Sequence, residues 1–173
     1  KLILLEQNKK LRNLIESRKI EKEIKKLMCR IYIDFDGVLV DTPKYIKKEI
    51  EKNGNFKSTF ENIKWNELLI KCSEICENLY YLKNNFKKND ITILTHVYSQ
   101  NEKMEKAKFI KDYIGDIDVL FVPHNIKKSE YVNPKNNLLI DDYNVNIDSW
   151  KSNGGIGYLF KNNMKLEEIL PLY

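Results

Sequence analysis

Two aspartates, Asp34 and Asp36, directly follow a short apolar segment that begins at Ile31. The β-branched and aromatic residues of that segment predict a strand, and side chains two positions apart on a strand share one face. Gly37 comes next and allows the backbone to turn sharply. Adjacent carboxylates at the end of a buried strand are costly unless a cation neutralises them, and Mg²⁺ prefers carboxylate oxygens while keeping positions open for phosphate. The spacing therefore predicts a magnesium site, with an acidic turn after a strand as the alternative.

Polar residues also follow two later segments that have the composition of strands. Thr95 ends one of them, and the adjacent acids Asp141 and Asp142 end the other. Lys127 and Lys128 lie in the loop before the second of these segments. Each residue alone has an ordinary explanation, such as a helix cap for the acid pair or a solvated position for the lysine. Because functional groups in open α/β sheets converge beyond the carboxyl ends of the strands, their common placement predicts one shared site.

Phosphoryl transfer is the chemistry that these residue types suit. The reaction depends mainly on positioning and on neutralising charge. A carboxylate nucleophile repels the phosphate that it must attack, and a metal ion, a lysine and hydroxyl donors offset that repulsion. The set therefore indicates an enzyme that acts on small phosphate esters.

The run Asp34-Phe35-Asp36-Gly37-Val38 resembles the first motif of the haloacid dehalogenase (HAD) superfamily, whose phosphatases carry Asp-x-Asp-Gly-(Thr/Val). The resemblance implies that Asp34 is the nucleophile and that Asp36 first protonates the leaving group and then activates water. It further implies a phosphate-binding hydroxyl, which Thr95 matches, and a charge-neutralising lysine, which Lys128 matches thirteen residues before Asp141, with Lys127 as the alternative. It also implies metal-binding acids, in which Asp142 is the better ligand and Asp141 its support. The expected catalytic residues are Asp34, Asp36, Thr95 and Lys128, and the expected Mg²⁺ ligands are Asp34, Asp36, Asp142 and Asp141.

Further residues resemble the 5′(3′)-deoxyribonucleotidase branch of that superfamily and its bacterial and phage relatives. They are the run 36–41, the run 139–142, Asn146-Ile147, Trp150 and Gly154-Gly155. This resemblance covers about residues 30–160 and implies nucleoside monophosphates as substrates, with aromatic residues of an inserted segment against the base. The expected substrate-binding residues are Thr95, His96, Lys128 and Trp65. Core packing is an equally good explanation for Trp65 and for the other aromatic residues of the insert.

Strand and helix patterns alternate from residue 31 onwards, which predicts an α/β fold. The expected architecture is a HAD-type, Rossmann-like parallel sheet with flanking helices and a small helical cap inserted after the first strand. Within the cap we expect a helix that starts at Pro43 and ends at Asn53-Gly54, a loop over 55–65 and a long helix over 66–86. The expected domains are a basic helical arm at 1–28, a core of 29–42 and 89–173, and a cap at 43–88.

The net charge of +5 over 173 residues is concentrated at the beginning of the chain. Residues 1–30 hold ten basic and four acidic side chains, so the rest of the chain is almost neutral. We therefore predict no nucleic-acid surface from charge alone. The segment 1–28 has a helical composition with an interrupted apolar stripe, which predicts either packing on its own domain or a contact between copies of the chain.

The three cysteines, Cys29, Cys72 and Cys76, are an odd number without CxxC spacing. They favour a reduced, cytoplasmic protein, and the pair spaced by four residues is better explained as buried thiols than as metal ligands. No apolar run is long enough to span a membrane, and no signal-peptide pattern is present at the start.

The sequence thus predicts a Mg²⁺-dependent phosphomonoester hydrolase that acts on nucleoside 5′- or 3′-monophosphates through an aspartyl-phosphate. Two alternatives stay open. One is a phosphatase for another small ester, such as a sugar phosphate or the end of a polynucleotide. The other is a binding protein in which a HAD-like core serves assembly through residues 1–28.

Overall fold

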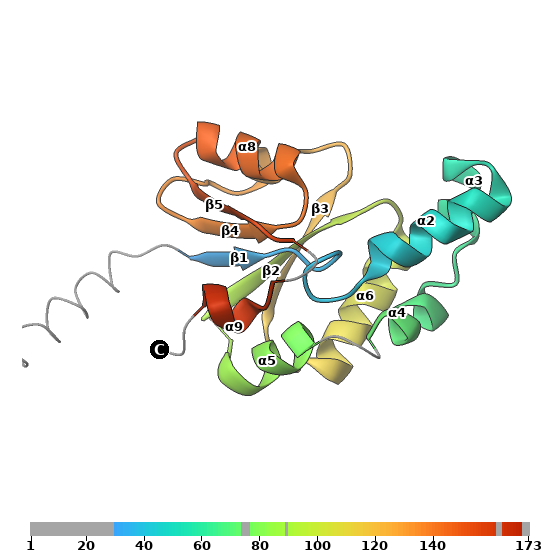
Figure 1. Cartoon of the computed structure of the whole chain (residues 1–173), viewed down its shortest axis with the longest axis horizontal. Helices are drawn as coiled ribbons and strands as arrows, with labels where there is room; N and C mark the ends of the chain where they lie inside the picture. Colours follow the sequence, from blue (N-terminus) through green and yellow to red (C-terminus); the bar gives the residue numbers. More distant parts are fainter. Residues whose placement is uncertain (1–29, 74–76, 89, 162–163, 171–173) are drawn as a thin grey trace, which may run out of the picture.

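A computed structural model of the chain describes residues 30–73, 77–88, 90–161 and 164–170. Its strands form a single five-stranded parallel sheet in the order β3-β2-β1-β4-β5 (Figure 1). This confirms the predicted α/β class with a Rossmann-like parallel sheet. The strands are β1 (Ile31–Ile33), β2 (Ile91–Val97), β3 (Asp118–Pro123), β4 (Leu138–Asp141) and β5 (Ile156–Leu159).

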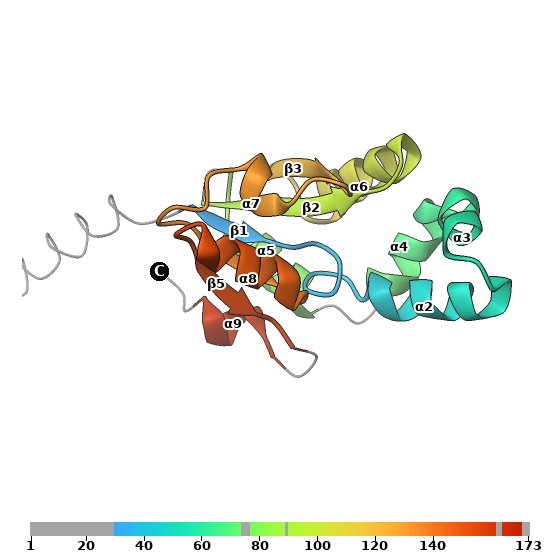
Figure 2. The same ribbon diagram turned by 90° about the horizontal axis from the view of Figure 1, so that it is seen from above.

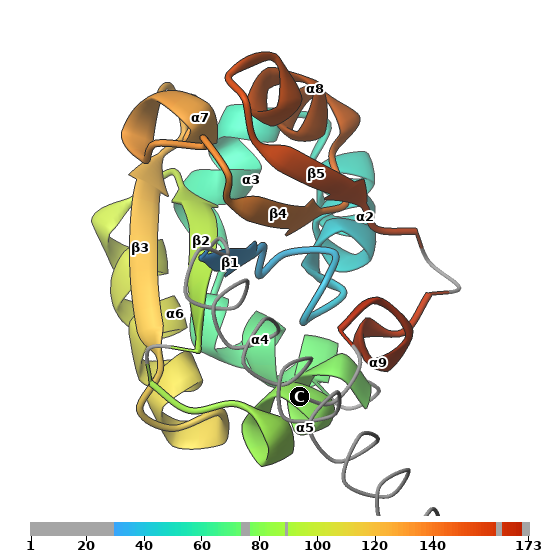
Figure 3. The ribbon, with the colours of Figure 1, turned by 90° about the vertical axis from the view of Figure 1, so that its left-hand side faces the viewer.

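Helices cover both faces of the sheet (Figure 3). One face carries α7 (Lys128–Tyr131) and α8 (Asn144–Ser152), and the other carries α5 (Glu77–Asn85), α6 (Gln100–Tyr113) and α9 (Leu166–Ile169). Successive side chains of a strand point to opposite faces, so Tyr32 packs under α8 against Trp150 while Ile33 joins the core on the α6 side. Burial on both faces explains why the central strands are almost continuously apolar.

Three helices lie beyond the carboxyl end of the sheet, apart from the two covering layers (Figure 2). They are α2 (Thr42–Asn53), α3 (Phe56–Asn62) and α4 (Trp65–Ser73). Pro43 lies in the first turn of α2, as predicted, and Gly54 ends that helix in a left-handed conformation. The end of the sheet at which the polar residues of the strands gather therefore faces this group of helices.

The prediction of a loop over 55–65 is wrong, because most of that segment forms α3. Asn55 explains the helix, since its side chain accepts a hydrogen bond from the backbone N–H of Ser58 at 3.1 Å. The single long helix expected over 66–86 is also replaced by two helices in different places. α4 contacts α2 and α6, whereas α5 packs against α9 on the sheet, so only α2–α4 have the position expected of a cap.

Residues 1–28, predicted as a helical arm, lie outside the described part of the chain, as do Cys29 and Cys76. Cys72 lies on α4 and is buried in the core, in line with the prediction of a buried thiol. Among the described residues, none of the helices combines the length and the apolar character that a membrane span requires.

Candidate active site

Asp34 stands directly after β1, where the chain leaves the sheet in a tight turn. Its backbone N–H still donates to the carbonyl of Ile140 in β4, so the residue is fixed to the end of the sheet. Only 7% of Asp34 is exposed, and its Oδ1 accepts from the backbone N–H of Phe35 at 2.8 Å. The turn continues through Gly37, whose N–H donates to the carbonyl of Val40. The predicted nucleophile is therefore held by backbone contacts on both sides.

Lys128, at the start of α7, reaches two carboxylates of the neighbouring strands. Its Nζ lies 2.8 Å from Oδ1 of Asp34 and 2.7 Å from Oδ2 of Asp141, and only 1% of the side chain is exposed. Burial alone would lower the pKa of Lys128, but Asp34 and Asp141 outweigh that effect and raise it. The ammonium group therefore stays charged between the two acids. Lys127 instead forms an exposed ion pair with Glu130, so the geometry favours Lys128 as the lysine of the site.

Asp141 is fully buried at the end of β4 and already holds several donors. Its Oδ1 accepts from the backbone N–H of Tyr143 at 2.9 Å, and Asn146 donates to both of its oxygens. Asn146 comes from the first turn of α8. With Lys128 added, the hydrogen-bonding capacity of this carboxylate is largely used inside the protein.

Asp142 differs from its neighbour because it faces the open side of the site. Its carboxylate lies so close to Gly37 that a Cβ atom on that glycine would sit 2.0 Å from Oδ2 of Asp142. Gly37 also has a φ of 77°, a left-handed conformation that favours glycine. The Asp-x-Asp-Gly run thus needs its glycine for two reasons, the turn itself and the space that Asp142 occupies.

Three carboxylates can share a cation here. Asp34, Asp141 and Asp142 each offer an oxygen, and these oxygens lie within 4.8 Å of one another. Burial, reinforced by the charge of Asp141, raises the pKa of Asp142 from its ordinary 3.8 to about 6. Burial also raises the pKa of Asp34, despite the ion pair with Lys128. Lys128 balances the charge of only one of these three carboxylates, so negative charge remains for a cation to neutralise. Carboxylate oxygens are ligands that fit a hard divalent cation such as Mg²⁺.

Asp36 points to a different set of partners. Its Oδ2 accepts from Nζ of Lys106 at 2.5 Å and from the Thr95 hydroxyl at 3.1 Å, and its Oδ1 accepts from the Thr42 hydroxyl at 2.5 Å. Burial alone would raise the pKa of Asp36, but Lys106 and the two hydroxyl groups outweigh it and lower the pKa. Thr95 is fully buried, with its hydroxyl directed at Asp36. Its predicted contact with phosphate stays a prediction.

A cleft of about 600 Å³ opens from these carboxylates towards α2 and α3. Asp34, Asp36 and Asp142 line its inner end. His96 also lines it, with Nε2 2.9 Å from the carbonyl oxygen of Ile126, and burial lowers the pKa of this imidazole. Trp65 reaches the same cleft but is only 2% exposed, so most of its ring is core rather than binding surface.

The outer wall of the cleft is aromatic. Phe56 and Phe60 of α3 contact Tyr98, which follows β2, with centroid distances of 5.9 and 4.6 Å. Tyr98 in turn stacks on His124 at 4.6 Å, with planes 18° apart. By contrast, Tyr80 and Tyr81, which sequence reasoning also considered for base contacts, lie on α5, and Tyr81 donates its hydroxyl to the carbonyl of Leu170. The cleft therefore has a charged inner end and an aromatic outer wall.

Sequence reasoning missed Lys106 and Glu102 of α6, which form a buried ion pair at 2.7 Å behind Asp36. A Glu–Lys pair four residues apart is usually a solvated feature of a helix surface. The signal was present in the helical periodicity, because both residues share the buried side of α6 with Phe109 and Ile110. A charged residue within an apolar stripe marks a group with a buried partner.

No protein-family model matches this chain, and no curated protein sequence matches it. Several solved structures are similar to it, among them the following three. A HAD family enzyme from Bacteroides thetaiotaomicron, in complex with magnesium and inorganic phosphate, is 14% identical with a TM-score of 0.45, and the match covers 83% of this chain and 99% of that one. A subfamily IA HAD-superfamily hydrolase from Geobacter sulfurreducens is 13% identical with a TM-score of 0.42, covering 79% and 89%. A β-phosphoglucomutase from Clostridium difficile is 19% identical with a TM-score of 0.40, covering 82% and 88%.

Proposed function

We propose that this chain is a Mg²⁺-dependent phosphomonoester hydrolase of the HAD type. The observation that carries the proposal is the arrangement at the carboxyl end of the sheet. Nζ of Lys128 forms an ion pair with Oδ1 of Asp34 at 2.8 Å. Asp141 and Asp142 offer carboxylate oxygens within 4.8 Å of an Asp34 oxygen, and Asp36 lines the same cleft. A buried nucleophile, a fixed cation and a second carboxylate for proton transfer are the groups that this reaction needs.

The reaction would proceed in two steps on the residues of the chain. A carboxylate oxygen of Asp34 attacks phosphorus, the bond between phosphorus and the ester oxygen breaks, and Asp36 gives a proton to that departing oxygen. Water then attacks the phosphorus of the aspartyl-phosphate, Asp36 takes a proton from the water, and inorganic phosphate leaves. Lys128 stays charged throughout, because its pKa is raised, and offsets negative charge beside Asp34.

Asp34 and Asp142 would hold the Mg²⁺ ion, with Asp141 oriented behind them by Asn146 and Lys128. Bound Mg²⁺ supplies positive charge that lets an anionic phosphate approach an anionic nucleophile. The sequence also predicted Asp36 as a metal ligand. Its oxygens contact Lys106, Thr42 and Thr95 and lie outside the group formed by the other three carboxylates among the described residues, so we assign Asp36 to proton transfer instead.

Nucleoside monophosphates are the substrates that we propose, and the aromatic outer wall supports them. Phe56, Phe60 and Tyr98 present ring faces or edges beside the cleft, and Phe56 and Tyr98 are about half exposed, at 50% and 46%. A base stacked on such a ring gains about 1–3 kcal/mol. We prefer Phe60 and Tyr98 to the sequence-predicted Trp65 for this contact, because Trp65 offers almost no exposed surface.

The reaction class is tested by phosphate release from a panel of esters with Mg²⁺ and with EDTA. The panel holds p-nitrophenyl phosphate, nucleoside 5′- and 3′-monophosphates, sugar phosphates and an oligonucleotide with a terminal phosphate. Asp34→Asn should abolish turnover, and borohydride reduction of the working enzyme should label residue 34 through its acyl-phosphate. Near wild-type turnover by Asp34→Asn, or full activity after chelation, would refute the proposed reaction. If no ester releases phosphate, the alternative of a non-catalytic binding protein that serves assembly would be favoured.

The substrate class is tested by Tyr98→Ala and Phe60→Ala. Each should lower kcat/KM for nucleotides by roughly 5- to 150-fold, which corresponds to the loss of about 1–3 kcal/mol of stacking. Sugar phosphates should be affected much less. Tyr80→Ala is the matched control, because Tyr80 is 60% exposed on α5 and lies away from the cleft. A wild-type enzyme that prefers sugar phosphates would overturn the nucleotide assignment and leave the phosphatase assignment standing.

A further inference from the structure

Lys106 is a fully buried charge next to the proposed acid–base residue. Only 1% of its side chain is exposed, and its Nζ lies 2.5 Å from Oδ2 of Asp36 and 2.7 Å from Oε1 of Glu102. The same ammonium also donates to the carbonyl oxygen of His96 at 3.1 Å. A buried lysine costs several kcal/mol unless acids and hydrogen bonds compensate it. Here two carboxylates and a carbonyl do so.

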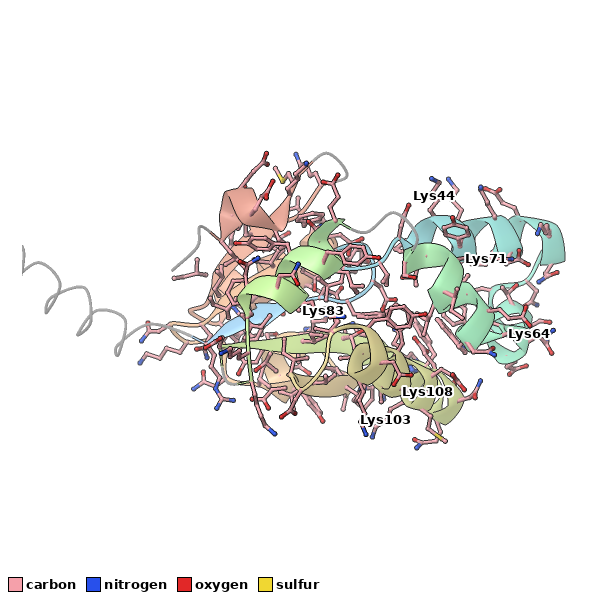
Figure 4. The ribbon with its side chains drawn as sticks, turned by 90° about the horizontal axis from the view of Figure 1, so that it is seen from below. Lys44, Lys64, Lys71, Lys83, Lys103 and Lys108 are labelled. Atoms are coloured by element: carbon pink, nitrogen blue, oxygen red, sulfur yellow. The ribbon has the colours of Figure 1, made fainter. Side chains whose placement is uncertain are left out.

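Glu102 fixes this lysine in place at the start of α6. Ser99 caps the helix by accepting from the backbone N–H of Glu102 at 3.1 Å. The second carboxylate oxygen of Glu102 accepts from the backbone N–H of Tyr98 at 2.7 Å. Lys106 lies one turn further along the helix, so Glu102 joins it to the end of β2. Lys103 and Lys108 of the same helix instead extend into solvent (Figure 4).

The two oxygens of Asp36 have unequal surroundings. Oδ2 is held from the protein interior by Lys106 and by the Thr95 hydroxyl. Oδ1 accepts one hydrogen bond, from the hydroxyl of Thr42, the first residue of α2. Since 24% of the Asp36 side chain is exposed and the residue lines the cleft, Oδ1 is the oxygen that a substrate can reach once Thr42 gives up its bond.

We propose that Lys106, held by Glu102, is a positioning residue that anchors Asp36 through Oδ2 and presents Oδ1 to the ester oxygen of the substrate. This inference rests on the proposed hydrolase function. In the first step Oδ1 gives the departing ester oxygen, as its bond to phosphorus breaks, the proton that it received from the attacking water of the previous turnover. In the second step Oδ1 takes a proton from the attacking water. The bond between phosphorus and the Asp34 oxygen breaks, which frees the Asp34 carboxylate and inorganic phosphate. Lys106 keeps its three protons throughout.

The surroundings of Lys106 exclude a direct role on phosphate. Its Nζ lies 5.5 Å from the centroid of the Trp65 ring and 5.7 Å from that of Phe35. These rings and the 1% exposure separate the ammonium from the cleft, so it acts only through Asp36. Trp65 belongs to α4 of the proposed cap. Lys106, which holds Asp36, therefore also packs against the cap.

A purely structural lysine and a positioning lysine predict different dependence on the leaving group. Protonation by Asp36 matters for an alkoxide, which leaves poorly without a proton. It matters little for p-nitrophenolate, which is a stable anion. Hydrolysis of the aspartyl-phosphate needs Asp36 as a base whatever the first leaving group was. Loss of the anchor should therefore slow the first step only for alkyl phosphates and the second step for every substrate.

The experiment compares Lys106→Met with wild type in single-turnover and burst measurements. With an alkyl phosphate, the first step should fall about 100- to 1,000-fold, in the range typical of general acid catalysis. With p-nitrophenyl phosphate, the variant should release one nitrophenolate per active site rapidly and then turn over slowly. Lys108→Met is the matched control on the solvent side of α6 and should behave as wild type.

The double variant Lys106→Met/Glu102→Met removes the opposing charges together, which guards against an uncompensated buried carboxylate in Glu102. It should show the same burst and the same leaving-group dependence. Equal loss of the first step for both ester types in this folded variant would overturn the proposal, as would wild-type turnover of the alkyl phosphate. If wild type itself releases no phosphate from any ester, the hydrolase assignment fails rather than the role of Lys106.

Discussion

The ionised side chain of Asp142 should destabilise the protein when no metal is bound. The substitution Asp142→Asn should therefore stabilise the metal-free protein and remove the response of its stability to Mg²⁺. The reason is the crowding of three carboxylates around one lysine. Burial and the adjacent Asp141 raise the pKa of Asp142 to about 6. A carboxyl with a pKa raised in the folded state binds its proton more tightly there than in the unfolded chain. Folding is therefore favoured at low pH, and that contribution is lost as the pH rises through about 6.

The magnitude follows from the shift. A rise from 3.8 to about 6 corresponds to about 3 kcal/mol for ionising Asp142 in the folded protein at neutral pH. Asp142 faces the open side of the site, so we reduce this to about 1–2 kcal/mol for solvent screening. In a chain of this length that change raises the melting temperature by about 2–8 °C. At pH 5 the effect should fall to about half, since much of the wild-type carboxyl is then protonated.

The assay is differential scanning calorimetry of wild type and Asp142→Asn in EDTA at pH 7.5 and pH 5, and in excess Mg²⁺ at pH 7.5. The variant should melt higher in EDTA at pH 7.5, and the gap should narrow at pH 5. Mg²⁺ should raise the melting temperature of wild type by mass action and leave that of the variant almost unchanged. Asp148→Asn, an exposed aspartate on α8, is the matched control. An Asp142→Asn protein that is no more stable in EDTA, or that still responds fully to Mg²⁺, would refute this reasoning.

Three further outcomes are expected. Gly37→Ala places a Cβ atom 2.0 Å from Oδ2 of Asp142, so titration calorimetry should show weaker Mg²⁺ binding, and unchanged binding would contradict the close approach. Trp65→Ala should destabilise the fold by about 3–5 kcal/mol in chemical denaturation and lower activity on nucleotides and p-nitrophenyl phosphate together, whereas a nucleotide-specific loss would restore Trp65 as a base contact. Deletion of residues 1–28 should leave turnover of a small ester intact and change assembly in light scattering; a soluble, unchanged oligomer without activity would show that the segment completes the site.

The grouping of acids and a lysine at the carboxyl end of the sheet could be predicted because chemistry restricts the residue types and the sheet restricts their places. Asp34 follows β1 directly, and Asp141 ends a parallel strand at the same edge of the sheet. Asp36 lies in the turn after β1 and points to other partners, so the expectation of one shared face does not describe it. The structure places β4 directly beside β1, which brings Asp34, Asp141 and Asp142 together. Lys128 then reaches both Asp34 and Asp141 from α7. The thirteen residues between Lys128 and Asp141 cover one short connection from α7 to β4.

Lys106 could not be identified in the same way, because α6 carries four lysines and the local sequence gives each of them a plausible solvent position. Its burial depends on Trp65 of α4, Phe35 after β1 and the packing of α6 under the sheet. Those contacts join segments that lie far apart in the sequence. Its one local mark is the stripe that it shares with Glu102 and Phe109 on the buried side of α6.

The aromatic outer wall of the cleft was the part of the site that the sequence predicted least well, for a related physical reason. Aromatic residues serve equally well as core and as binding surface, so composition alone does not separate Trp65, at 2% exposure, from Phe56, at 50%. The distinction depends on α3, which Asn55 caps and which we expected to be a loop. Once α3 forms, Phe56 and Phe60 lie one turn apart and meet Tyr98 of the core. In the proposed hydrolase, the groups that would act on phosphate therefore come from the ends of the strands, whereas the proposed base contacts come from one short helix and a single tyrosine.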